Sequence, residues 1–129
     1  MTPPKQVWPT IRYDDAPAAI RFLVDVCGFE ESLVVKGDGE RVIEHAQLRW
    51  PEGGGVMCGS RATAEGAEFN TERVGVYVVT DDPDAVCVRA KASGAEIVRD
   101  IQDEDYGGRG FSVRDAEGNV WTFGSYRGE

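Results

Sequence analysis

Residues 81–94 read DDPDAVCVRAKASG and contain the main signals of a short helix. Asp82 can cap the first turn, Pro83 suits the first helical position, and Gly94 suits the position just beyond the last turn. The stretch VGVYVV (residues 74–79) lies just before it and is rich in residues that favour strands. This part of the chain therefore predicts a strand followed by a helix.

The same helix signals occur earlier in the chain, in DDAPAAIRFLVDVCG (residues 14–28). Asp14 or Asp15 is the candidate cap there, and Gly28 is the candidate end. Gly28 and Gly94 lie 66 residues apart, so two similar units follow each other along the chain. A repeated order of elements at a fixed period indicates an internal duplication.

Each predicted helix has one predicted strand before it and three after it. The strands are expected at residues 7–13, 29–36, 41–50 and 55–60 in the first half, and at residues 74–79, 95–101, 110–114 and 119–126 in the second half. Residues 61–73 carry few large apolar side chains and are predicted to link the halves. The prediction is an α+β fold of two βαβββ modules, about residues 7–60 and 74–126, that form curved mixed sheets.

The composition narrows the class of protein and of partner. With 129 residues, of which 41% are apolar, residues 1–129 have the size and content of one globular domain. The 23 acidic and 14 basic residues give a formal net charge of −9, which repels nucleic acid and anionic lipid. Apolar stretches fall far short of the ~18 residues of a membrane span, and the opening residues MTPPKQVWPT do not form a leader. We expect a cytoplasmic protein with no nucleic-acid partner and no membrane partner.

The three cysteines are Cys27, Cys58 and Cys87, which lie among apolar neighbours and form no C-x-x-C pair. This spacing favours reduced, packed thiols over a disulfide framework. Cys58 lies on a predicted inner strand without a local base or cation that could activate it. We therefore expect it to be buried and inert.

The closing segment GGRGFSVRDAEGNVWTFGSY (residues 107–126) completes a family resemblance. Together with the two helical stretches, it resembles the vicinal oxygen chelate superfamily, which includes glyoxalase I, extradiol dioxygenases, fosfomycin-modifying enzymes and bleomycin-resistance proteins. The similarity covers roughly residues 7–128, and the pattern G-R-x-F-x-V-x-D-x-x-G-N is closest to the bleomycin-resistance-type branch. The resemblance implies paired βαβββ modules, and commonly a homodimer whose grooves are built from both chains.

Glyoxalase-like members of that superfamily hold a metal ion with His and Glu from the first and last strands of each module. The corresponding positions here are Thr10, Cys58, Gly75 and Thr122, none of which is His or a carboxylate. A divalent ion needs about three or four such donors. We therefore predict no metal, no cofactor and no catalytic residue.

The candidate ligand contacts are polar residues of one strand and several aromatic residues. His45 is the only histidine, and it shares a strand face with Gln47 and Arg49. A lone His on a strand is more often a hydrogen-bonded sheet residue than a catalytic base, but this polar face would contact a ligand if it lined the groove. The other candidates are Trp50, Tyr106, Trp121, Tyr126 and Arg109. Arg109 also has a structural explanation, because the acidic run at residues 103–105 can pair with it.

These features predict metal-independent binding or sequestration of a small cationic or aromatic molecule, of the antibiotic-resistance type. Aromatic rings stack on flat ligands and attract cations, and the negative net charge acts in the same direction. Two alternatives stay open. The first is a glyoxalase-like lyase or isomerase, or a dioxygenase, with a non-standard metal site that recruits His45. The second is a metabolite-sensing or protein-interaction module.

Overall fold

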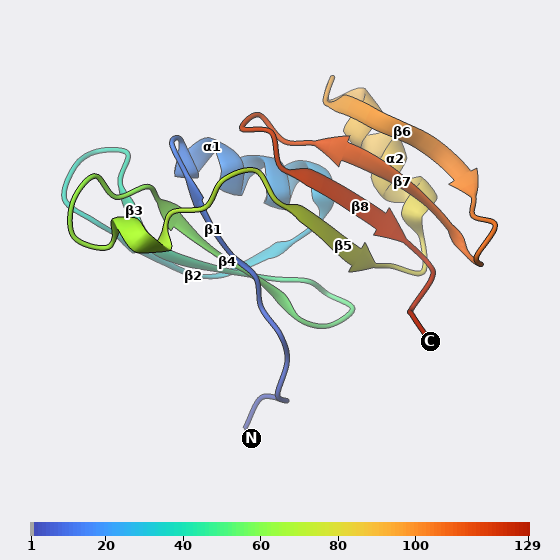
Figure 1. Ribbon diagram of the computed structural model, residues 1–129, viewed down its shortest axis with the longest axis horizontal. Helices are drawn as coiled ribbons and strands as arrows, with labels where there is room; N and C mark the ends of the chain where they lie inside the picture. Colours follow the sequence, from blue (N-terminus) through green and yellow to red (C-terminus); the bar gives the residue numbers. More distant parts are fainter. Residues whose placement is uncertain (1) are drawn as a thin grey trace.

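The computed structural model describes residues 2–129 and contains two four-stranded mixed sheets (Figure 1). The first sheet consists of β1 (Thr10–Tyr13), β2 (Glu30–Lys36), β3 (Ile43–Arg49) and β4 (Gly55–Ser60). The second consists of β5 (Gly75–Val79), β6 (Glu96–Asp103), β7 (Arg109–Arg114) and β8 (Val120–Gly124). The helices are α1 (Ala16–Arg21), the π-helix η1 (Phe22–Cys27), the 3₁₀-helix η2 (Ala67–Phe69) and α2 (Pro83–Ala92).

The strand order is the same in both sheets and confirms the predicted pair of βαβββ modules. It is β1-β4-β3-β2 in the first sheet and β5-β8-β7-β6 in the second. The strand before each helix pairs in parallel with the last strand of its module, and all other pairs are antiparallel. A helix-bearing crossover is what a parallel pair requires. Several strands are shorter than predicted; β1, for example, starts at Thr10 rather than at residue 7.

The helix signals of the sequence are present in the structure. The side chains of Asp15 and Asp82 accept hydrogen bonds from the backbone N–H three residues later, at 3.2 and 3.1 Å. Gly28 and Gly94 follow the helices with φ of 104° and 78°, a left-handed conformation that glycine adopts without steric cost. The sequence did not predict η1, where α1 widens into a π-helix. Such segments are rare, and they are frequent at functional sites.

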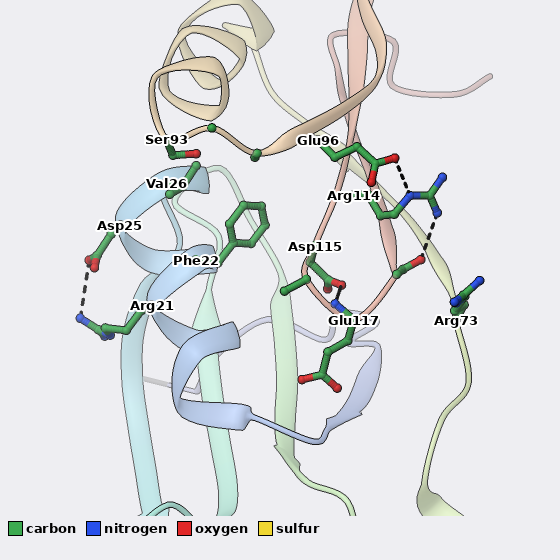
Figure 2. A pocket seen from close by; sticks show the side chains of 14 residues that line it. Arg21, Phe22, Asp25, Val26, Arg73, Ser93, Glu96, Arg114, Asp115 and Glu117 are labelled. Carbon is green, nitrogen blue, oxygen red and sulfur yellow. Dashed lines mark hydrogen bonds and ion pairs between the residues drawn. The ribbon is translucent and has the colours of Figure 1, made fainter.

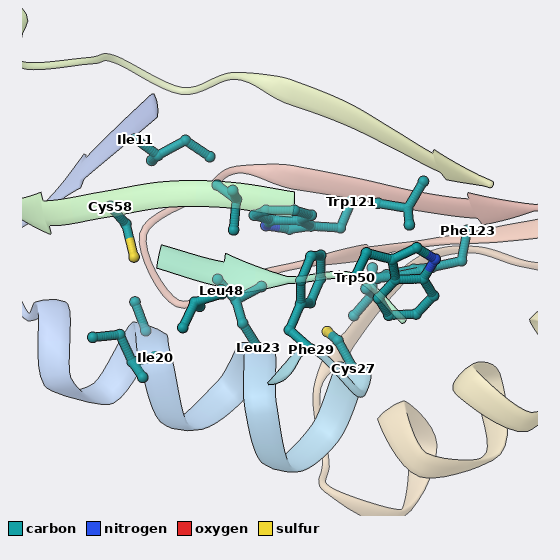
Figure 3. Packing of buried hydrophobic residues seen from close by; sticks show 14 of the residues in the cluster. Ile11, Ile20, Leu23, Cys27, Phe29, Leu48, Trp50, Cys58, Trp121 and Phe123 are labelled. Atoms are coloured by element: carbon teal, nitrogen blue, oxygen red, sulfur yellow. The ribbon is translucent and has the colours of Figure 1, made fainter. Parts of the chain in front are cut away.

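One core lies between the helices and the helix-bearing faces of both sheets. Helix α1 packs against β1, β3 and β4, and α2 packs against β6, β7 and β8. Figure 3 shows Trp50, Phe29 and Trp121 packed beside Leu23 and Cys27 of η1. The rings of Phe29 and Trp121 are 5.8 Å apart, so aromatic contacts join the two modules. The large aromatic side chains are thus the centre of a core shared by both modules.

Reciprocal hydrogen bonds also join the modules. Glu117, in the turn between β7 and β8, accepts bonds from the backbone N–H groups of Asp14 and Asp15, at 2.6 and 2.9 Å. Glu52, in the equivalent turn of the first module, accepts a bond from the backbone N–H of Asp81 at 2.8 Å. Each module therefore caps the strand-to-helix junction of the other.

The opposite face of each sheet carries no helix, and we call it the open face. In β3, for example, Ala46 and Leu48 are buried under α1, while His45 and Gln47 alternate with them and are only half-buried. None of the helices formed by residues 2–129 has both the length and the apolar character that crossing a membrane requires.

Candidate functional site

Trp50 and Trp121, both predicted ligand contacts, lie in the core and are only 6% and 0% exposed. The indole N–H of Trp121 donates to Asp115 at 3.1 Å, and that of Trp50 donates to the carbonyl oxygen of Val79 at 2.9 Å. Trp121 shares its strand face with Phe123, and this face turns toward the helices. The prediction of a tryptophan wall on the groove is therefore corrected, because neither indole can stack on a molecule at the open face.

Arg109 also lies on the helix side of the second sheet. Its guanidinium forms ion pairs with Asp84 of α2 at 3.0 Å and with Asp103 of β6 at 3.2 Å. The hydrogen bonds that Arg109 donates to Asp84 and then to Asp103 raise the pKa of Arg109. The Arg109 side chain therefore links α2 to the second sheet. This agrees with the structural explanation given above, in which Arg109 pairs with the acidic run, and not with a ligand contact.

His45, Gln47 and Arg49 share one strand face, as predicted, and this face is the open face of the first sheet. The Nε2 atoms of His45 and Gln47 are 3.0 Å apart, and the guanidinium carbon of Arg49 lies 5.6 Å from the centre of the Trp8 ring. Trp8 was not predicted as a site residue; the sequence placed it in a strand at residues 7–13, but β1 begins only at Thr10. Its contact with Arg49 is a cation–π pair at an exposed edge.

Tyr106 and Tyr126 come together beside the second sheet, although they are twenty positions apart in the sequence. Their rings meet edge to face, with centres 5.1 Å apart and an interplanar angle of 80°. The hydroxyl of Tyr77 in β5 donates to the backbone oxygen of Tyr126 at 2.8 Å. A Cβ atom at Gly124 would lie 2.5 Å from that hydroxyl oxygen, so glycine leaves the space that Tyr77 occupies. The structure thus brings two predicted tyrosines to a third that the sequence did not single out.

A row of polar side chains crosses the open face of the second sheet from Tyr77. In register, Tyr77 of β5 pairs with Thr122 of β8, Thr122 with Ser112 of β7, and Ser112 with Arg99 of β6. Residues opposite each other on neighbouring strands share a face. The hydroxyl oxygens of Ser112 and Thr122 are 2.7 Å apart.

Arg99 is the last residue of this row, and it forms a bidentate ion pair with Glu104. Both terminal nitrogens of the guanidinium donate to the carboxylate at 2.6 Å. The carboxylate also accepts bonds from the hydroxyl of Tyr106 and, at 3.3 Å, from Gln102. Its hydrogen bond with Arg99, followed by that with Tyr106, lowers the pKa of Glu104 to about 2. The Glu104 side chain is only 6% exposed, whereas that of Arg99 is 38% exposed.

We call this constellation the second-sheet site. It consists of three tyrosines, two hydroxyl residues and the ion pair: Tyr77, Tyr106, Tyr126, Ser112, Thr122, Arg99 and Glu104. It offers aromatic ring surface, hydroxyl groups and an exposed guanidinium on one side of the sheet. These are the groups that recognise a flat polar molecule.

A hollow of about 910 Å³ lies on the helix side, between η1 and the turn that joins β7 to β8 (Figure 2). Phe22 and Val26 of η1 form part of its apolar wall. Its charged groups are largely engaged with one another. Arg114 donates to Glu96 at 3.0 Å, and Glu117 binds backbone N–H groups of the first module. Among these groups Glu117 joins the two modules, whereas Arg114 and Glu96 pair within the second module.

Comparison with known proteins identifies the family. Residues 5–123 match the family described as the Glyoxalase/Bleomycin resistance protein/Dioxygenase superfamily. The chain belongs to this superfamily. The crystal structure of TioX from Micromonospora sp. ML1 is 35% identical in sequence, with a TM-score of 0.75, over 94% of this chain and 98% of TioX. A search of curated protein sequences found no significant match.

More distant superfamily structures share the fold alone. The fosfomycin resistance protein FosX from Listeria monocytogenes is 14% identical, with a TM-score of 0.61, over 95% of this chain and 93% of its own. Lactoylglutathione lyase from Agrobacterium tumefaciens is 20% identical, with a TM-score of 0.63, over 95% of both chains. The superfamily fold therefore accommodates proteins with different activities, and the site must decide the function.

The donor set at the four superfamily metal positions does not suit a divalent ion. Thr10 and Thr122 lie on the open faces, but Cys58 points into the core and Met57 takes its place opposite Thr10. Gly75 has no side chain to offer. Across residues 2–129, no three His, Cys, Asp or Glu side chains gather as a metal ion requires. These four positions therefore do not form the metal site of the glyoxalase-like members.

The three cysteines are free and buried, as predicted. Burial raises the pKa of Cys27 and of Cys58 to about 12 each, and it also raises the pKa of Cys87. A thiolate, not a thiol, is the nucleophile in cysteine chemistry. None of the three is poised for nucleophilic catalysis.

Proposed function

We propose that the chain binds and sequesters a small aromatic molecule without a metal ion. The observation that carries the proposal is the second-sheet site, in which Tyr77, Tyr106 and Tyr126 meet beside the paired hydroxyls of Ser112 and Thr122. The rings offer flat surface, and the hydroxyls can orient polar substituents. The superfamily metal positions hold Thr10, Cys58, Gly75 and Thr122, which do not suit a divalent ion, and this supports binding without a metal.

The expected strength of such binding is moderate. Each favourable aromatic pair contributes about 0.5–1.5 kcal/mol beyond the burial of its surface. Two such pairs, the buried ring area and one or two hydrogen bonds reach the ~8 kcal/mol of a micromolar complex. Sequestration needs no more than this, because the protein acts by holding its ligand.

We further propose that two copies of the chain complete the groove. Leu33 and Val35 of the first sheet and Tyr77 of the second are 43%, 39% and 43% exposed, and all three lie on open faces. An open face of this kind, when set against that of a second copy, becomes the wall of a groove that excludes water. In a two-fold dimer each groove would draw residues from both chains.

Calorimetric titration against a panel of flat aromatic antibiotics, in buffer containing EDTA, tests the proposal. We expect a micromolar ligand, and we expect Tyr106→Ala and Tyr126→Ala to weaken it by about tenfold each, which corresponds to roughly 1.4 kcal/mol. The matched control is Phe69→Ala, which removes an exposed ring on η2, away from the second-sheet site. Circular dichroism verifies that each variant is folded.

Three results would count against the function. They are a panel without a ligand, unchanged affinity in both tyrosine variants, and binding that EDTA abolishes. Mass spectrometry of the ligand recovered from the complex provides a further check. Recovery of a chemically altered ligand would replace sequestration with catalysis.

A further inference from the structure

The open faces carry exposed guanidinium groups although the whole chain is acidic. The formal net charge is −9, yet Arg12 and Arg49 lie on the open face of the first sheet, and Arg99 lies on that of the second. Within residues 2–129, neither Arg12 nor Arg49 forms an ion pair with a carboxylate. On the first sheet Glu30 lies opposite Arg49, whereas on the second sheet the exposed guanidinium of Arg99 is the charged group that a ligand meets.

Glu104 does not offset this positive charge toward a ligand. Its side chain is 6% exposed and already accepts bonds from Arg99, Gln102 and Tyr106. A carboxylate surrounded by donors in this way has little capacity left for an incoming cation. Its role is to hold Arg99 in place.

Arg99 keeps hydrogen-bonding capacity for a ligand. A guanidinium has five N–H donors, and the contacts with Glu104 engage one on each terminal nitrogen. The side chain is 38% exposed, so the remaining donors can be reached from the open face. A guanidinium held in one orientation by a buried partner pays little further entropy when it binds an acidic oxygen.

The same carboxylate places a ring beside this guanidinium. The Tyr106 hydroxyl donates to Glu104, which Arg99 also contacts, so ring and cation share one anchor. Tyr126 meets the Tyr106 ring edge to face. A flat molecule that stacks on this pair can present an edge substituent to Arg99.

We propose that the second-sheet site selects aromatic acids. This proposal rests on the proposed function and specifies the class of ligand. The aromatic ring lies on Tyr106 and Tyr126, and a carboxylate or phenolate oxygen accepts hydrogen bonds from the N–H groups of Arg99 that Glu104 leaves free. Hydrogen bonds between ionised partners are roughly twice as strong as neutral ones, so they decide between ligands of similar shape. The ligand class is thus anionic, in contrast to the cation that the net charge suggests.

Three probes of nearly equal shape and different charge test the proposal: 2-naphthoate, 2-naphthamide and 2-naphthylmethylammonium. Calorimetric titration of the wild-type protein at pH 7 is expected to rank them in that order, with naphthoate about tenfold tighter than naphthamide. In Arg99→Gln this preference should disappear, while the affinity for naphthamide changes less than about twofold.

Two variants keep the test interpretable. Arg99→Gln leaves the Glu104 carboxylate without its main partner, so the double variant Arg99→Gln with Glu104→Gln removes both charges of the pair. Arg109→Gln is the matched control, since it removes a guanidinium from the opposite side of the same sheet. The double variant should lose the preference for naphthoate, and Arg109→Gln should retain it.

The outcomes separate this inference from the proposed function. Equal affinity for the three probes, a preference for the ammonium, or an unchanged preference in the folded double variant overturns the selection of acids and leaves aromatic binding intact. Failure of all three probes to bind at millimolar concentration counts against the proposed aromatic site itself, and against the selection of acids with it.

Discussion

Asp115 is a buried residue whose carboxylate joins the first module to the second. It is buried, and its carboxylate accepts hydrogen bonds from the Tyr13 hydroxyl at 2.9 Å, the Trp121 indole at 3.1 Å and the Asn119 amide at 3.0 Å. Tyr13 belongs to the first module and the other two to the second. Burial and the charge of Asp115 raise the pKa of Tyr13, so the phenol stays protonated as the donor.

Replacement of Asp115 should therefore destabilise the fold strongly. Asp115→Ala leaves three buried donors without an acceptor, at a cost of about 1–3 kcal/mol for each unsatisfied group. We expect the free energy of unfolding, measured by urea titration, to fall by about 3 kcal/mol or more. The control is Asp105→Ala in the exposed loop before Tyr106, which should change stability by less than about 0.5 kcal/mol. A loss below about 1 kcal/mol in Asp115→Ala would contradict this role.

The pair of Glu104 and Arg99 predicts a specific dependence of stability on pH. The pKa of Glu104 is lowered in the folded chain from the ordinary 4.5 to about 2. The ionised carboxylate therefore stabilises the fold fully above the unfolded pKa, and this contribution is lost as pH falls from 4.5 toward 2.

Urea unfolding of wild type and Glu104→Gln over a series of pH values measures this contribution. The wild type should be the more stable protein at pH 7, and the difference should shrink steadily below pH 4.5 as the wild-type carboxylate becomes protonated. A difference that stays constant down to the folded pKa of about 2 would show that the ion pair is not linked to folding.

At the scale of the elements, the second helix offers the cleaner test of capping. Asp82 accepts a bond from the backbone N–H of Ala85 at 3.1 Å and has no ion-pair partner among residues 2–129, whereas Asp15 also pairs with Arg41 at 2.7 Å. Asp82→Ala should lower the free energy of unfolding by about 1 kcal/mol, and Asp82→Asn, which can still cap, should stay within a few tenths of wild type. Chemical denaturation measures both. Equal losses in the two variants would assign the effect to the charge of Asp82 instead of to its hydrogen bond.

At the scale of the molecule, the open faces determine the assembly that we expect. Exposed apolar side chains such as Leu33 and Val35 lie on a face without a helix, where a second copy could cover them. A chain of 14.1 kDa should therefore give a mass of about 28 kDa in light scattering at micromolar concentration. Leu33→Asp should shift the mass toward the monomer, because the charge would be buried at the interface.

The control for assembly is Val88→Asp, on the outer surface of α2. This change should leave the mass unaltered, because Val88 is exposed on the helix side. A wild-type mass of 14.1 kDa would refute the dimer. An equal shift of the mass in both variants would instead contradict the placement of the interface on the open face, since dissociation would then follow from added charge in general.

The sequence by itself determined the elements and their order. Caps such as Asp82, turn glycines such as Gly28 and the alternation within β3 act between residues that are close along the chain, so their effects can be predicted locally. The repeat of these signals after 66 residues was enough to predict the two βαβββ modules. The lack of metal donors at Thr10, Gly75 and Thr122 could also be read from the sequence once the resemblance placed those positions.

Only the tertiary structure decided which face of each strand the core covers. Alternation in β8 separates Trp121 from Thr122 but is the same whichever side the helices occupy, so the tryptophans could not be assigned to core or groove in advance. The second-sheet site depends on strand register and on the path of a loop. Register places Arg99 opposite Ser112, and the loop returns Glu104 to Arg99. These contacts form only when strands distant in sequence pair, and that pairing is a property of the whole fold.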